Sequence, residues 1–236
     1  RPNYIFSKKD LQKNLNLKCG IEIKSYFLSK INNEDLEINN QLALLLPTSG
    51  STGSPKYVRL SKKNIFHNSL SIAKYLKIRS DDIPITTLPP SYTYGLSILH
   101  SHIHIGCKIV INNYSFFEKN FWNLIKKSKA TTFGGVPYHY EILNKLRFTE
   151  MDLPNLRTLT QAGGKMKIEL IQKFTDFCER NNKNFFVMYG QTEATARMSY
   201  LKTIDYPNKI GSIGKCIPDG IFELRDSNGD LIKENN

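Results

Sequence analysis

The sequence has little of what builds disulfide frameworks, zinc clusters or membrane spans. Its 4 cysteines are far apart and include no C-x-x-C pair, which indicates buried thiols in a reducing compartment. No apolar run approaches the roughly 20 residues that a membrane helix needs, and no signal peptide precedes the first predicted strand. We therefore expect a cytoplasmic protein without a transmembrane segment.

Arginine and acidic residues are also scarce. Of the 33 basic residues 8 are Arg, against 21 Asp and Glu, and the net charge is +12. The lysines are spread along the chain, whereas a nucleic-acid surface usually gathers Arg and Lys into one stripe. We expect no nucleic-acid partner, and a positive field that favours small polyanions. A basic nucleic-acid-binding protein is the alternative, and it would bind random DNA with steep salt dependence.

A loop rich in glycine and hydroxyl residues follows a short apolar run. Residues 42–46 are apolar, end at Pro47 and predict a buried strand. The loop Thr-Ser-Gly-Ser-Thr-Gly-Ser-Pro-Lys at residues 48–56 offers backbone, hydroxyl and ammonium donors, which suit a polyphosphate. An ordinary flexible turn is the alternative. A Walker A loop does not fit, because Pro55 stands five residues after Gly50 and Tyr57 follows the lysine.

A second motif, Tyr-Gly-Gln-Thr-Glu at residues 189–193, follows the strand predicted at residues 185–188. A carboxylate oxygen is a ligand that Mg²⁺ prefers, and a flat aromatic ring can cover a nucleobase. A helix cap is the alternative for this motif alone. Its place at a strand end, downstream of the first loop, favours a binding function.

The two motifs resemble those of the adenylate-forming superfamily, which contains acyl-CoA synthetases, adenylation domains of peptide synthetases and luciferases. The resemblance covers roughly residues 42–230 and is greatest to acyl-activating AMP-dependent synthetases. It implies an AMP-forming ligase that activates a carboxylic acid with ATP and Mg²⁺ to an acyl-adenylate. The intact enzyme would pass the acyl group to CoA or to the phosphopantetheine of an acyl carrier protein. The alternatives are a non-catalytic nucleotide- or acyl-binding module and an amino-acid adenylation domain.

The resemblance also implies roles for the motif residues. The phosphates would be held by Thr48, Ser49, Gly50, Ser51, Thr52, Gly53 and Lys56. The adenine would be framed by Gly164, Lys165, Met166 and Tyr189, and the nucleotide would also contact Met188, Gly190 and Gln191. Thr192 would meet the α-phosphate, and the catalytic residues would be Thr192, Glu193 and Lys56. Glu193 and Thr52 would bind the metal.

The acid pocket is implied by weaker patterns. Pro89, Tyr92, Gly95 and Leu96 supply the superfamily's Pro-x-x-aromatic-x-x-Gly-Leu pattern, with Tyr92 where many acyl-CoA synthetases have His. No Asp lies between Pro89 and Leu99, which counts against an amino-acid substrate. A buried structural role is an equal alternative for Tyr94. The substrate residues implied are Tyr92, Tyr94, Gly95, Gly135, Val136 and Gly190.

Strands alternate with helices at least five times, which predicts an α/β fold with a largely parallel sheet, flanking helices and ligand loops at the carboxyl ends of the strands. A further strand is predicted at residues 106–111, and a helix beginning after Ser61. His100, His102 and His104 alternate, but the superfamily has a helix there, on which they could not converge on a metal.

We expect an incomplete N-terminal segment (1–41), an α/β nucleotide- and acyl-binding core (42–205) and the start of a small β-barrel subdomain (206–236). In this subdomain, residues 222–226 predict a strand and Asn228-Gly229 a hairpin turn. The superfamily's ribose-binding Thr-Gly-Asp and its lid with a catalytic lysine do not occur after Asp226. The start at Arg1 and the polar end indicate a piece of a longer chain, which we expect to be inactive by itself.

Overall fold

The computed structural model describes residues 4–8, 21–23, 26–30, 38–48 and 56–232. The chain forms two compact units, residues 1–42 and residues 43–236. In the first unit, three antiparallel strands lie in the order β1-β3-β2. Their bounds are Tyr4–Lys8 for β1, Ile21–Ile23 for β2 and Tyr26–Lys30 for β3.

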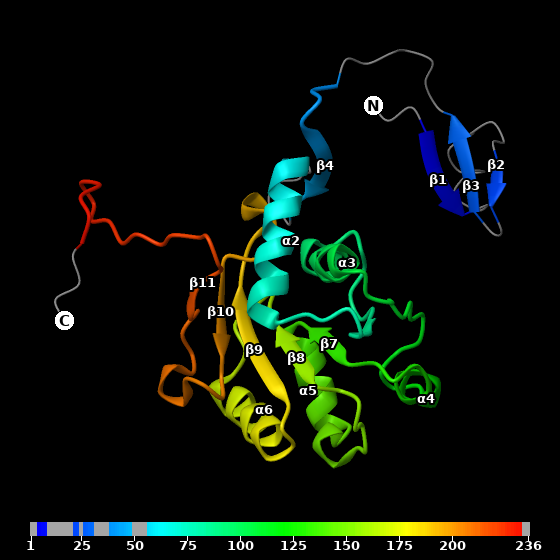
Figure 1. Cartoon of the computed structure of the whole chain (residues 1–236), viewed down its shortest axis with the longest axis vertical. Coiled ribbons are helices and arrows are strands. Elements are labelled where there is room, and N and C mark those ends of the chain that lie inside the picture. The colour runs from blue at the N-terminus through cyan, green and yellow to red at the C-terminus, as the bar shows by residue number, and fades with distance from the viewer. Residues whose placement is uncertain (1–3, 9–20, 24–25, 31–37, 49–55, 233–236) are drawn as a thin grey trace. The chain divides into compact units, whose positions relative to one another are not determined.

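The second unit is built on a sheet whose strands lie in the order β11-β10-β9-β8-β7-β6. Figure 1 labels the strands from β11 to β7. The strands β6 to β9 pair in parallel, and β10 and β11 are antiparallel. This confirms the predicted largely parallel sheet. The bounds are β6 Pro84–Ile85, β7 Thr132–Gly135, β8 Thr158–Gln161, β9 Asn184–Tyr189, β10 Ser199–Lys202 and β11 Lys215–Cys216. A separate pair consists of β4 (Leu42–Pro47) and β5 (Tyr57–Ser61).

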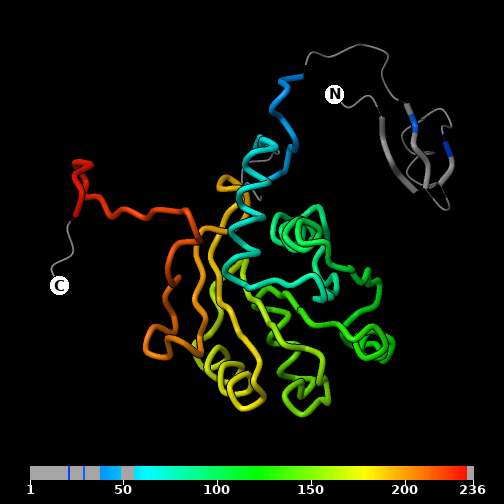
Figure 2. Tube along the Cα trace, in the orientation of Figure 1, coloured from blue at the N-terminus to red at the C-terminus, as the bar shows by residue number. Residues whose placement is uncertain are grey.

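Helices connect the parallel strands, and the trace runs β7-α5-β8-α6-β9 (Figure 2). The helices are α2 Lys62–Leu76, α3 Thr93–Ile105, α4 Lys119–Ser128, α5 Pro137–Lys145 and α6 Ile168–Arg180, with 3-10 turns η1 Phe148–Glu150, η2 Thr192–Ala194 and η3 Pro207–Lys209. The predicted cap of α2 is confirmed, because the Ser61 hydroxyl accepts a hydrogen bond from the Asn64 N–H at 3.0 Å.

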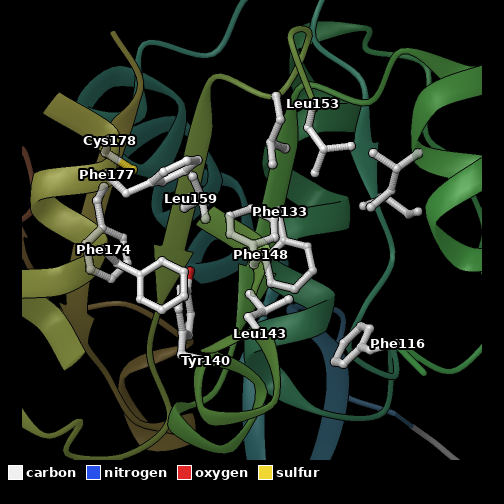
Figure 3. Close-up of a cluster of buried hydrophobic side chains, with 14 of the residues drawn as sticks. Phe116, Phe133, Tyr140, Leu143, Phe148, Leu153, Leu159, Phe174, Phe177 and Cys178 are labelled. Carbon is white, nitrogen blue, oxygen red and sulfur yellow. The ribbon is translucent and has the colours of Figure 1, made fainter. Parts of the chain in front are cut away.

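Successive residues of a strand point to opposite faces of the sheet, and helices cover both faces. Phe133, Leu159 and Phe185 pack on one face against α4, α5 and α6. Figure 3 shows part of this aromatic-rich cluster, including Tyr140, Phe148 and Phe174. On the other face, Phe186 and Met188 pack against α2 and α3. The result is a three-layer α/β/α unit.

Two predicted strands are shorter than expected. In the segment 106–111, Val110 alone forms a parallel bridge, to Ile85. Its partner β6 is two residues long and contains Pro84, which has no N–H to extend a ladder. Likewise residues 222–226 contribute a single antiparallel bridge, Arg225 to Leu231. The predicted turn between these bridged residues is present, with Gly229 at φ +87°.

The alternating histidines lie on α3, as expected from the superfamily. His102 is buried, and its Nδ1 lies 2.8 Å from the Ile98 carbonyl oxygen; burial lowers the pKa of this imidazole to about 4. Within the described ranges, no three His, Cys, Asp or Glu side chains are grouped to hold a metal ion. Nor does this part of the chain include a helix long and apolar enough to span a bilayer.

Candidate active site

The predicted site segments meet at one edge of the sheet. Gly135 pairs with Gln161, and Gln161 pairs with Val187, so the ends of β7, β8 and β9 lie in register. Because these strands are parallel, the loops that follow them emerge at the same edge. The segments after β7 and β8 and the Tyr189–Glu193 motif after β9, which were expected from separate motifs, are therefore brought together.

A cavity of about 450 Å³ lies between the loop after β8 and the end of β9. Met166 and Met188 are buried and form apolar walls of the cavity, whereas Tyr189 is 41% exposed. An apolar cavity bordered by an aromatic ring suits a flat nucleobase. Of the seven residues predicted to frame adenine or contact the nucleotide beside it, six line the cavity: Gly164, Lys165, Met166, Met188, Tyr189 and Gly190. The seventh, Gln191, is exposed on the approach to η2.

Other residues line the same cavity without having been predicted. Gly163 could have been found, since it belongs to the same glycine turn as Gly164. The rest come from the end of β8, from α6, from within β9 and from the segment after η3, where the sequence carries no ligand motif. They are Gln161, Gly163, Ile171, Val187, Gly211, Ser212 and Ile213.

Glycines at this edge allow backbone segments to approach closely. A Cβ on Gly190 would collide with the carbonyl oxygen of Ala196. Gly163 has φ +82° and lies against the Tyr92 hydroxyl, with Val136 Cγ1 3.1 Å from where its Cβ would be. Tyr92 and Val136, both predicted acid-pocket residues, therefore each lie against the loop predicted to bind adenine.

The remaining predicted acid-pocket residues pack against protein atoms. Tyr94 is buried, and its hydroxyl donates to the Thr160 carbonyl oxygen at 2.9 Å. Burial raises the pKa of Tyr94 to about 12, so the phenol stays protonated. A Cβ on Gly95 would collide with the Pro89 carbonyl oxygen, and one on Gly135 would lie 3.1 Å from Tyr140. These contacts give the three residues a structural role; an additional role in binding acid stays a prediction.

The second motif ends in the short turn η2. The hydroxyls of Thr192 and Thr93 lie 2.8 Å apart, which joins this turn to the start of α3. Glu193 is exposed, and none of the ion pairs in the described segments includes it. Its carboxylate is therefore available to a cation.

The ends of the predicted phosphate loop lie together, since the Thr48 N–H donates to the Lys56 carbonyl oxygen at 3.0 Å. Leu46 and Leu60, from the flanking strands, line a small pocket with Thr93 and residues 195–196, so these strands pack beside the second motif. Lys56 is exposed. The predicted phosphate residues Ser49, Gly50, Ser51, Thr52 and Gly53 lie outside the described residues, and with them the metal role of Thr52.

A buried arginine, Arg197, contacts Met188, one of the residues that form the cavity wall. Arg197 donates from Nε to the Ser97 hydroxyl at 3.2 Å and from Nη1 to the Tyr75 hydroxyl at 3.0 Å. Nη1 also lies 3.0 Å from Met188 Sδ, and the guanidinium carbon is 4.9 Å from the Tyr94 ring centroid. Arg197 thereby joins α2, α3 and β9 behind the Met188 wall. No pattern in the sequence indicated this role.

Solved structures of related fold include the N-terminal domain of FACL13 from Mycobacterium tuberculosis, with a TM-score of 0.72, 22% identity and coverage of 85% of this chain and 50% of that one. Another is the O-succinylbenzoate coenzyme A synthetase of Bacillus subtilis in complex with ATP and magnesium ion. Its TM-score is 0.70 at 24% identity, over 86% of this chain and 42% of that one. At these identities the likeness shows the fold.

Curated relatives include the acyl-CoA ligase sidI of Aspergillus fumigatus, which is 29% identical over 188 residues, 78% of this chain and 32% of that protein. The 2-succinylbenzoate–CoA ligase of Bacillus pumilus is 30% identical over 191 residues, 80% of this chain and 37% of its own length. The chain thus spans about a third of the length of these relatives. Residues 7–236 match the family described as AMP-binding enzyme. The chain belongs to this family of AMP-binding enzymes.

Proposed function

We propose that this chain is the nucleotide- and acid-binding part of an AMP-forming ligase. The observation that carries the proposal is the shared edge of the sheet, which brings together the Tyr189 cavity, the glycine turn at Gly163 with Tyr92 and Val136 beside it, and the exposed Glu193 carboxylate. A substrate carboxylate would attack the α-phosphorus of ATP there, forming acyl-AMP and releasing pyrophosphate. The relatives described above are ligases that act with CoA, which supports a ligase over a non-catalytic module or an amino-acid adenylation domain.

The residues present fit ATP and Mg²⁺. The apolar walls from Met166 and Met188 accept a base, and Glu193 offers the hard oxygen ligand that Mg²⁺ prefers. The metal would neutralise charge on the phosphates when bound. Lys56 and the hydroxyls of residues 48–52 would hold the β- and γ-phosphates. Thr192, fixed by Thr93, would donate to the α-phosphate as negative charge grows on it during attack.

The second half of the reaction and its setting are further parts of the proposal. The acyl-adenylate would pass to a thiol, either CoA or the phosphopantetheine of an acyl carrier protein, in the cytoplasm. The CoA ligases among the relatives support CoA as acceptor. None of the 236 residues supplies the superfamily's Thr-Gly-Asp or its lid lysine, so the chain by itself would not complete the first step.

The test is acid-dependent exchange of pyrophosphate into ATP by the complete protein, with a panel of fatty, aryl and amino acids. We expect exchange with acids that lack an α-amine, because no Asp lies between Pro89 and Leu99 to hold an ammonium. Exchange confined to free amino acids would establish the amino-acid adenylation alternative. ATP binding without exchange for any acid would support the non-catalytic module instead.

A further inference from the structure

The amide of Gln161 has an unusual position in the cavity wall. Gln161 is the last residue of β8, is 0% exposed and lines the cavity. Its Nε2 donates to the Gly164 carbonyl oxygen at 2.9 Å. This bond fixes the orientation of the amide, because the amide oxygen could not donate to a carbonyl. Oε1 is left buried, with no hydrogen-bond partner among the described residues.

A buried acceptor without a donor is uncommon in folded proteins and calls for a partner. The buried side chains that share this cavity, Met166, Ile171 and Met188, carry no N–H or O–H group. A ligand that enters the cavity with an N–H donor would therefore gain a hydrogen bond in an apolar setting. One that presents an acceptor would place two oxygen or nitrogen lone pairs against each other.

We infer that Gln161 is a specificity-determining residue that accepts a hydrogen bond from the exocyclic amine of an adenine base. The inference rests on the proposed function, which brings a nucleotide into this cavity. Inosine carries a carbonyl oxygen where adenosine carries the amine, so the same contact disfavours it. Gln161 would thereby select ATP over ITP, in addition to holding the Gly164 loop.

The experiment compares dissociation constants of ATP and ITP, each with Mg²⁺, for the wild-type protein and the Gln161→Met variant. A hydrogen bond to a buried group is worth about tenfold in affinity, so we expect at least that preference for ATP in the wild type. Gln161→Met should reduce it to about twofold, mainly by weakening ATP. The control is Gln172→Met, since Gln172 is exposed on α6 and donates to Asp176 at 2.7 Å; it should keep the wild-type ratio.

A purely structural role predicts a different outcome. If Gln161 serves the Gly164 loop alone, or holds a buried water, both nucleotides weaken in parallel and the ratio is unchanged, which overturns the inference. Should Gln161→Met not fold, purine riboside triphosphate decides in the wild type, because it lacks the amine. It should bind about tenfold more weakly than ATP, and equal affinity overturns the inference. Absence of ATP binding by the wild type overturns the proposed function, and this inference with it.

Discussion

Glu193 is the residue on which the proposed metal site depends. Its carboxylate is exposed on η2 beside Thr192. Glu193→Gln should lower acid-dependent pyrophosphate exchange at least about 100-fold, because the amide has lost the charge that binds Mg²⁺. Stability should change by less than about 0.5 kcal/mol, as is usual for exposed positions.

Exchange assays and thermal unfolding of Glu193→Gln measure the two quantities. Glu179→Gln, at an exposed position on α6, is the matched control and should leave both unchanged. Near-normal exchange in a folded Glu193→Gln protein would remove Glu193 from the metal site.

Arg197 joins the helices α2 and α3 to the strand β9. Its replacement by Met leaves the Ser97 hydroxyl without its donor and removes a cation from the Tyr94 ring. Met188 also loses a contact, so the cavity wall loosens. We expect Arg197→Met to lose about 2 kcal/mol of unfolding free energy and to bind ATP more weakly. Denaturant titration checks this, with Arg180→Met, at an exposed position on α6, as the control. Equal stability of the two variants would refute it.

At the scale of elements, one carboxylate ties together the amino ends of three parallel strands. Asp82 precedes β6 and is 1% exposed. It accepts hydrogen bonds from Arg157 before β8 (Nε at 2.8 Å) and from the Thr131 hydroxyl before β7 at 2.9 Å. Burial raises the pKa of Asp82, but the bonds from Arg157, from the Arg79 N–H and from Thr131 outweigh it and leave the pKa below its usual value.

This cluster predicts how stability depends on pH. A depressed carboxyl pKa contributes stability above the unfolded value of about 4, and the contribution is lost as pH falls through the folded pKa. Asp82→Asn should cost about 2–3 kcal/mol at pH 7, less than for a fully buried pair because Arg157 is 25% exposed. The difference from wild type should shrink below about pH 4.

The control for Asp82→Asn is its neighbour Asp81→Asn, which breaks an exposed pair with Arg79. Exposed pairs contribute about 0–1 kcal/mol, so its unfolding curve should follow the wild type at each pH. Urea titrations between pH 3 and pH 7 make the comparison. A pH-independent deficit in Asp82→Asn would contradict the assignment.

Elements were predictable where the pattern is local. The strands β7, β8 and β9 each end at a glycine or run into a turn that contains glycine, and Ser61 marks the start of α2. The strand β10 was not predicted, because its four residues alternate too briefly to stand out. Nor could sequence alone pair Arg197 with Tyr75, 122 residues away. Motif residues were readable since their spacing is fixed within a loop, whereas supporting residues depend on which elements meet.

At the scale of the whole molecule, the family membership covers residues 7–236. The 236-residue chain incubated with ATP, Mg²⁺ and mixed acids should form no measurable AMP or pyrophosphate, because no residue in it matches the ribose-binding Asp or the lid lysine. Circular dichroism should nevertheless show a folded α/β protein. Clear turnover would refute this expectation.

Different kinds of hydrogen bond hold the amino ends and the carboxyl ends of the parallel strands. Asp82 holds the amino ends, whereas at the other edge Tyr94 bonds a carbonyl, Thr93 meets Thr192, and Arg197 bonds hydroxyls; no carboxylate takes part in these contacts. Acid therefore protonates the Asp82 carboxylate and weakens the hydrogen bonds at the amino ends, whereas the hydrogen bonds at the carboxyl ends are retained. On acidification, amide hydrogen exchange should accelerate first around residues 82–84 and 131–132, while the edge that holds the candidate site stays protected. Acid unfolding of the sheet would therefore begin at the amino ends of the parallel strands and reach the carboxyl ends, where the candidate site lies, last.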